Sequence, residues 1–143
     1  MHQRLLSIMA LAFIALALLQ SLLGGILFWK TIGFSAEQIL AHYSEKSFHG
    51  LLEVMLPHTL FIGIALAATL HFLAFVQQIN TKVKTAAVSL LYPFFLLDQA
   101  SPIGMMLGVD LFAYVKIVAF VGFELTLASV WVIVFTNTLK ELK

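Results

Sequence analysis

The residues best suited to chemistry lie in a single apolar stretch of the chain. The segment HGLLEVMLPHTLFIGIALAATLH contains His49, Glu53, His58 and His71 among aliphatic residues. Imidazole and carboxylate groups bind divalent metals, and imidazole also ligates b-type haem. Because ionisable groups are costly inside a membrane, each of these residues indicates either a functional site or the end of a membrane-spanning helix.

The first hypothesis is a metal site. His49 and Glu53 are four residues apart and share a helix face, offset by about 40° at about 100° per residue. His58 would point away from them on a straight helix, but Pro57 precedes it directly, and a proline inside a helix commonly kinks the axis. We therefore predict a divalent metal site formed by His49, Glu53 and His58. The alternative is a set of ordinary ion pairs at the membrane interface.

The second hypothesis is a cofactor site at His58 and His71. Four-helix membrane cytochromes hold b-type haem between histidines of facing helices. The thirteen positions between these two residues separate them by about 140° on a helix, which excludes two haems stacked on one face. A single haem would need His49 with His58 across the outer bend, His71 with Met9 of the first span, or a histidine of another subunit. A quinone is the other candidate ligand.

A third hypothesis concerns Glu124, which lies within the apolar run of the last segment. A carboxyl group at that depth needs a partner or a proton. His71 is predicted to approach it from an antiparallel helix, so that the two form a proton or cation pair. A structural hydrogen bond that sets helix register is the alternative.

Asp98, Asp110 and Lys116 are predicted to form a polar cluster near the outer side of the membrane. The amine of a long lysine side chain can reach outward to a carboxylate. This cluster is compatible with a cation site, and equally with simple interfacial ion pairs.

Composition determines the setting in which these side chains act. Of 143 residues, 62% are hydrophobic and 10% are charged, which indicates an integral membrane protein. The chain has no cysteine, which excludes thiolate metal sites and iron–sulfur clusters. Its net charge of +1 gives no basic surface for a nucleic-acid partner.

Four segments are long enough to cross a bilayer, which takes about 20 apolar residues. They run over about residues 5–29, 50–77, 83–107 and 111–136. We predict an all-α membrane protein, a four-transmembrane-helix bundle that forms a single domain over residues 1–143. In the first extracytoplasmic loop, Ser35 and Gln38 have the spacing of a capping box, which predicts a short interfacial helix.

Basic residues near the ends of short loops favour the cytoplasm. Five such residues fall on one predicted side of the membrane: Arg4, Lys82, Lys84, Lys140 and Lys143. The opposite side has Lys30 and Lys46, which Glu37 and Glu45 balance. Both termini are therefore predicted to be cytoplasmic, with a bacterial inner membrane as the expected location.

These patterns favour a small redox subunit that binds haem, a metal or a quinone through the histidines of the second span. One alternative is a proton- or cation-coupled transporter that uses Glu124 and His71. The other is a non-catalytic scaffold or accessory subunit. Catalysis by the chain alone is not expected, because no nucleophile–base pair or phosphate-binding loop is recognisable. Beyond the lipid bilayer, the expected partners are further copies of the chain or a larger membrane complex.

Overall fold

Four of the five helices are long and apolar enough to cross a membrane. The computed structural model describes residues 2–142; Lys143 lies outside them. The helices are α1 (His2–Thr31), α2 (Ala36–Ser44), α3 (Phe48–Phe75), α4 (Thr81–Met106) and α5 (Leu111–Leu142). No strand occurs within the described residues. The predicted all-α bundle with four transmembrane helices and a short fifth helix is confirmed.

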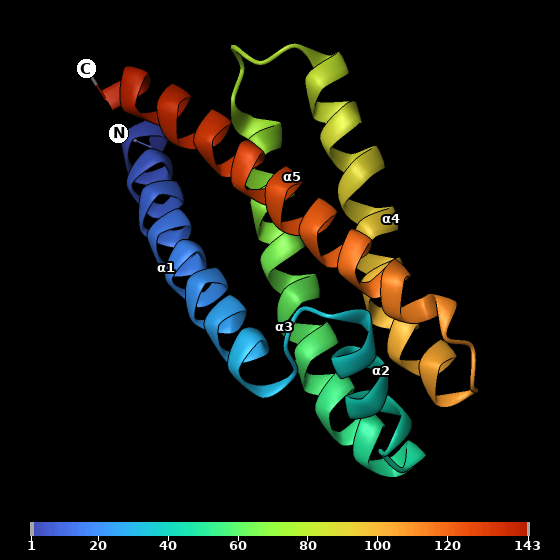
Figure 1. The fold of residues 1–143 in the computed structure, drawn as a ribbon. Coiled ribbons are helices and arrows are strands. Elements are labelled where there is room, and N and C mark those ends of the chain that lie inside the picture. Colours follow the sequence, from blue (N-terminus) through green and yellow to red (C-terminus); the bar gives the residue numbers. More distant parts are fainter. Residues whose placement is uncertain (1, 143) are drawn as a thin grey trace.

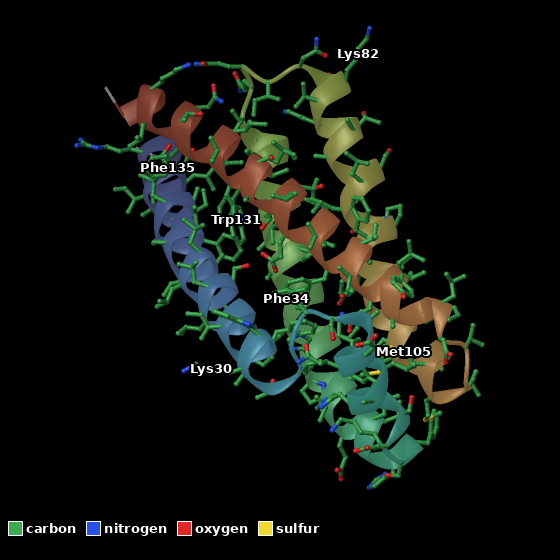
Figure 2. The ribbon with its side chains drawn as sticks, in the orientation of Figure 1. Lys30, Phe34, Lys82, Met105, Trp131 and Phe135 are labelled. Atoms are coloured by element: carbon green, nitrogen blue, oxygen red, sulfur yellow. The ribbon has the colours of Figure 1, made fainter. Side chains whose placement is uncertain are left out.

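The long helices alternate in direction along the chain. Both described ends of the chain and the α3–α4 loop lie at one end of the bundle, called here the termini end (Figure 1). α2 and the α4–α5 turn lie at the opposite end, called here the α2 end. In Figure 2, Lys82 marks the termini end and Lys30 lies toward the α2 end. Each long helix therefore connects the two ends, as a membrane-spanning bundle requires.

α5 is the central helix of the bundle. It runs diagonally across the view in Figure 1 and contacts α1, α2, α3 and α4. α4 and α5 approach closely where they contain glycine, since the Phe112 ring covers Gly104 and the Phe94 ring covers Gly122. The main buried core lies where α5 meets α3 and α4, and it includes Leu66, Leu73, Leu91, Phe123, Leu127, Val130, Trp131 and Val134.

α2 is set in place by its first turn and by one buried face. The Ser35 hydroxyl accepts from the Gln38 backbone N–H, and the Gln38 side chain accepts from the Ser35 N–H. This capping box satisfies helix-end N–H groups that have no partner within the helix. Ile39 is fully buried in a second core cluster with Met105 of α4 and Ala113 of α5. α2 therefore packs on α4 and α5, and Figure 2 shows Met105 beside it.

Candidate functional site

A buried ion pair joins α4 and α5 on the side of the bundle toward the α2 end. Lys116 Nζ lies 2.7 Å from Asp98 Oδ1, and the two side chains are only 9% and 10% exposed. The lysine also donates to the Asp98 backbone carbonyl at 3.1 Å. Removing two charges from water is expensive, and their attraction offsets this cost only when further hydrogen bonds complete the pair.

Neutral polar side chains supply some of the hydrogen bonds that the buried ion pair needs. Asp98 Oδ2 accepts a 2.8 Å hydrogen bond from Gln99 Nε2, and Gln99 Oε1 accepts one of 2.6 Å from the Thr59 hydroxyl of α3. Asp98 Oδ1 has no hydrogen bond of good geometry among the described residues, so its only close polar contact is the ion pair with Lys116. A polar network therefore links α3, α4 and α5 through a single carboxylate.

α2 contributes an aromatic hydroxyl beside this network. Burial of Tyr43, together with the negative charge of Asp98, raises the pKa of the Tyr43 phenol to about 12. Tyr43 thus stays a neutral donor over the whole physiological range. One residue earlier, burial and the positive charge of Lys46 lower the pKa of His42, while Glu45 opposes that shift.

Glu124 forms a second polar contact, deeper in the bundle. Its Oε2 accepts a 2.5 Å hydrogen bond from the Ser21 hydroxyl of α1. Asp98 lies close enough to interact electrostatically with this carboxyl group. The α5 helix therefore carries two polar sites at different depths, and each involves a side chain from another helix.

The structure does not bring Glu124 and His71 together. Trp131 Nε1 donates to Thr69 Oγ1 at 3.2 Å, which fixes the relative depth of α5 and α3. From that bond, His71 lies about 3 Å toward the termini end and Glu124 about 10 Å toward the α2 end, at about 1.5 Å per residue. The predicted pair is thus separated along the bundle, and the partner of Glu124 is Ser21.

His71 and His58 both lie on exposed surface of α3. The His71 ring makes T-shaped contacts with two neighbouring rings, its centroid lying 6.2 Å from that of Phe72 and 4.6 Å from that of Phe75. His58 lies within electrostatic range of Lys116 and Asp98. Because the two histidines occupy separate depths and directions on one helix, they do not form a facing pair of haem ligands within one chain.

The predicted three-ligand metal site also does not assemble. His49 and Glu53 do meet, with Nε2 and Oε1 3.1 Å apart, but both side chains are largely exposed. Within residues 2–142, no three His, Cys, Asp or Glu side chains gather closely enough to hold a metal ion. Pro57 lies inside α3 without interrupting it, and this explains why His58 keeps its direction away from His49.

Of the predicted outer cluster, the structure joins Asp98 with Lys116 and leaves Asp110 exposed at the start of α5. Sequence reasoning missed Ser21, Gln99 and Thr59. These residues are uncharged, so no charge in the sequence marked them as partners of the carboxylates.

A pocket of about 400 Å³ lies at the termini end, between α1, α3 and α5. Its lining combines apolar side chains with hydroxyl and amide groups: Leu5, Leu6, Ser7, Met9, Ala10, Phe72, Phe75, Val76, Gln77, Val134 and Thr138. Met9, which sequence analysis offered as a haem ligand with His71, lines this pocket, whereas His71 does not.

Comparison with known proteins identifies the domain that contains these sites. A family model named Aq_1264_TM, described as a transmembrane helical domain, matches residues 33–143. No curated protein and no solved structure gives a significant match. The matched region includes α2 to α5, and with them the Asp98–Lys116 pair and Glu124. The chain therefore belongs to the Aq_1264_TM family of transmembrane helical domains.

Proposed function

We propose that this small integral membrane protein moves protons or small cations, with Asp98, Lys116 and Glu124 as the exchanging groups. The observation that carries the proposal is the Asp98–Lys116 pair, which is about nine-tenths buried between two apolar helices. Ionisable residues inside membrane spans are rare and most often belong to ion or proton pathways. The two charges cancel only while the Asp98 carboxylate is unprotonated. A single proton bound at this carboxylate therefore changes the net charge of the buried pair.

Protonation of Asp98 would cancel its charge and leave the Lys116 ammonium without its counter-ion. A buried unpaired charge is strongly unfavourable, so the lysine would then lose a proton or move toward solvent. Its long stem allows such movement. The carboxylate gains a proton from one side and the ammonium loses one to the other, and transfer of the carboxylic proton to the neutral amine then restores the ion pair, so that one proton has passed through the site.

The neighbouring groups extend this site in both directions. Toward the α2 end, His58 is exposed and within electrostatic range of the pair. Toward the middle of the bundle, Glu124 interacts electrostatically with Asp98 and accepts from Ser21. We infer a route from His58 through Asp98 and Lys116 to Glu124. His71, predicted from the sequence as the partner of Glu124, has no part in this route.

A redox role is the second candidate, and the pocket at the termini end supports it. A quinone has an apolar tail and a polar ring, and this pocket offers apolar side chains beside hydroxyl groups. Haem or metal binding would require His58, His71, or His49 with Glu53 to find further ligands in another subunit. Oxidised and reduced absorption spectra of the purified protein, together with metal and quinone analysis, test this role independently of proton transport.

We further propose that the termini end faces the cytoplasm of a bacterial inner membrane. The support is the position of Lys82 and Lys84 in the α3–α4 region and of Arg4 and Lys140 near the chain ends, since basic residues in short loops favour that side.

Proton flux into sealed vesicles tests the transport proposal. Purified protein is reconstituted with a pH-sensitive dye inside the vesicles, and a potassium diffusion potential drives the flux. Glu124→Gln keeps the size and the hydrogen-bond acceptor but cannot carry the proton, so flux should fall to the level of empty vesicles. Asp110→Asn, which alters an exposed carboxylate, should leave flux unchanged. Equal flux in wild type and Glu124→Gln would reject the proposed role of Glu124.

A further inference from the structure

α1 presents an amide to the lipid near the middle of its span. Gln20 is exposed and has no hydrogen-bond partner among the described residues. Its neighbour Ser21 points toward α5 and donates to Glu124. Gln20 lies about 14 Å from the interfacial Trp29, at about 1.5 Å per residue, while the hydrocarbon core is about 30 Å thick. The amide is therefore near the bilayer centre, without water.

The surface around Gln20 forms a continuous exposed face, called here the Gln20 face. Leu16 and Leu27 lie within about 40° of Gln20 on the helix, and Gly24 at about 40° on the other side. Leu16 and Leu27 are 68% and 62% exposed, and a Cβ built on Gly24 would meet nothing within 4 Å. Among the described residues, the main contacts of α1 with the other long helices are those with α5 and α3. The Gln20 face is thus available to another helix.

We propose that the Gln20 face binds the same face of a second copy of this chain, so that two α1 helices pack across a two-fold axis. A carboxamide carries both donors and an acceptor, and two glutamines related by two-fold symmetry therefore satisfy each other. Isologous contacts of this kind are self-complementary. Gly24 removes the side chain where the two backbones approach most closely, as small residues do between membrane helices.

The chemistry of the face favours a second copy over a different protein. A partner helix with a carboxylate would place a charge at the bilayer centre, and α1 offers no cation at that depth to neutralise it. A neutral amide matches a neutral amide. This proposal does not depend on proton transport, because the Gln20 face lies about 100° around α1 from Ser21.

Disulfide cross-linking tests the proposed dimer without background, because the chain contains no cysteine. Leu27→Cys places a thiol on the Gln20 face. Leu22→Cys is the matched control, since Leu22 is also exposed, at 65%, but lies about 160° away on the helix. Oxidation of the full-length protein in vesicles should give a covalent dimer with Leu27→Cys and only monomer with Leu22→Cys.

Gln20→Leu, introduced into the Leu27→Cys variant, distinguishes the contribution of the amide to dimer formation from that of apolar packing. Interhelical hydrogen bonds in membranes stabilise by about 1 kcal/mol, so cross-linked dimer at limiting protein density should fall about fivefold. Gln20→Asn keeps the amide and should restore most of the yield. Equal cross-linking by both cysteines, an unchanged yield in Gln20→Leu, or cross-linking only to a different protein in native membranes would overturn the proposal.

Discussion

At the scale of single residues, Asp98 and Lys116 depend on each other. Each is enclosed by apolar helices, and neither has another charged group in contact with its head group among the described side chains. Partners of this kind are far more costly to lose singly than together, because a single replacement leaves one charge buried and unpaired.

The pair therefore predicts a non-additive pattern of stability. Lys116→Met and Asp98→Asn should each lower the free energy of unfolding by about 3 kcal/mol, whereas the double variant should lie within about 1 kcal/mol of wild type. Chemical unfolding in detergent, followed by the helical signal, measures all four proteins. The exposed Asp110→Asn is the control. Additive losses would show that the ion pair does not act as a unit.

Tyr43 gives a second prediction at this scale. Its pKa is raised from 10.0 to about 12 by burial and by Asp98. The unfolded phenol ionises near pH 10 and the folded one near pH 12, so Tyr43 stabilises the fold fully below pH 10 and loses this contribution between pH 10 and pH 12. The difference between ultraviolet titrations of wild type and Tyr43→Phe should have its midpoint near 12. A midpoint near 10 would contradict the burial of Tyr43 against the pair.

The sequence predicted the roles of single residues only where the side chain is charged. Lys116 and Asp98 are recognisable because charged residues in apolar segments need a counterpart. Ser21 is not recognisable in this way. The structure separates Glu124 from His71, because α3 and α5 run parallel to each other and not antiparallel, as the sequence reasoning assumed. The Trp131–Thr69 hydrogen bond, which sets the register, has no sequence signature.

At the scale of helices, the spans were predictable because apolar length alone defines them. The span predicted over residues 50–77 is α3, Phe48–Phe75, and the helix predicted from the Ser35–Gln38 capping box is α2. The direction in which each helix faces was not predictable. Lipid tails and the protein core are equally apolar, so the sequence of α3 carries no strong contrast between its buried and exposed faces, and His71 gave no sign of facing outward.

The close approach of α4 and α5 predicts a selective effect of glycine substitution. A Cβ added at Gly104 would lie 2.3 Å from the Phe112 ring, whereas one added at Gly63 of α3 would meet nothing within 4 Å. Gly104→Ala should therefore destabilise the protein by about 1–3 kcal/mol through overpacking. Gly63→Ala should be neutral or slightly stabilising, since alanine favours helix over glycine. Thermal unfolding in detergent distinguishes the two. Equal stability of both variants would mean that α4 and α5 can separate freely at Gly104.

At the scale of the whole molecule, the bundle is organised around α5. This helix contacts all of the others, carries Lys116 and Glu124, and supplies Trp131 to the core. α2 adds Ile39 and Tyr43 at one end, so the ion pair lies beneath a short helix rather than open to solvent. On the proposed route, protons enter at the exposed His58 of α3, while Glu124, deeper in the bundle, depends on α1 through its hydrogen bond with Ser21.

Proton flux through vesicles containing the double variant Asp98→Asn/Lys116→Gln, compared with wild type at equal protein content, tests whether the ion pair is the exchanging site. The double variant retains the fold because neither charge is left unpaired, and circular dichroism on the same vesicles verifies this. We predict flux for wild type and none above empty vesicles for the double variant. Undiminished flux through a folded double variant would contradict the assignment of this pair as the exchanging site.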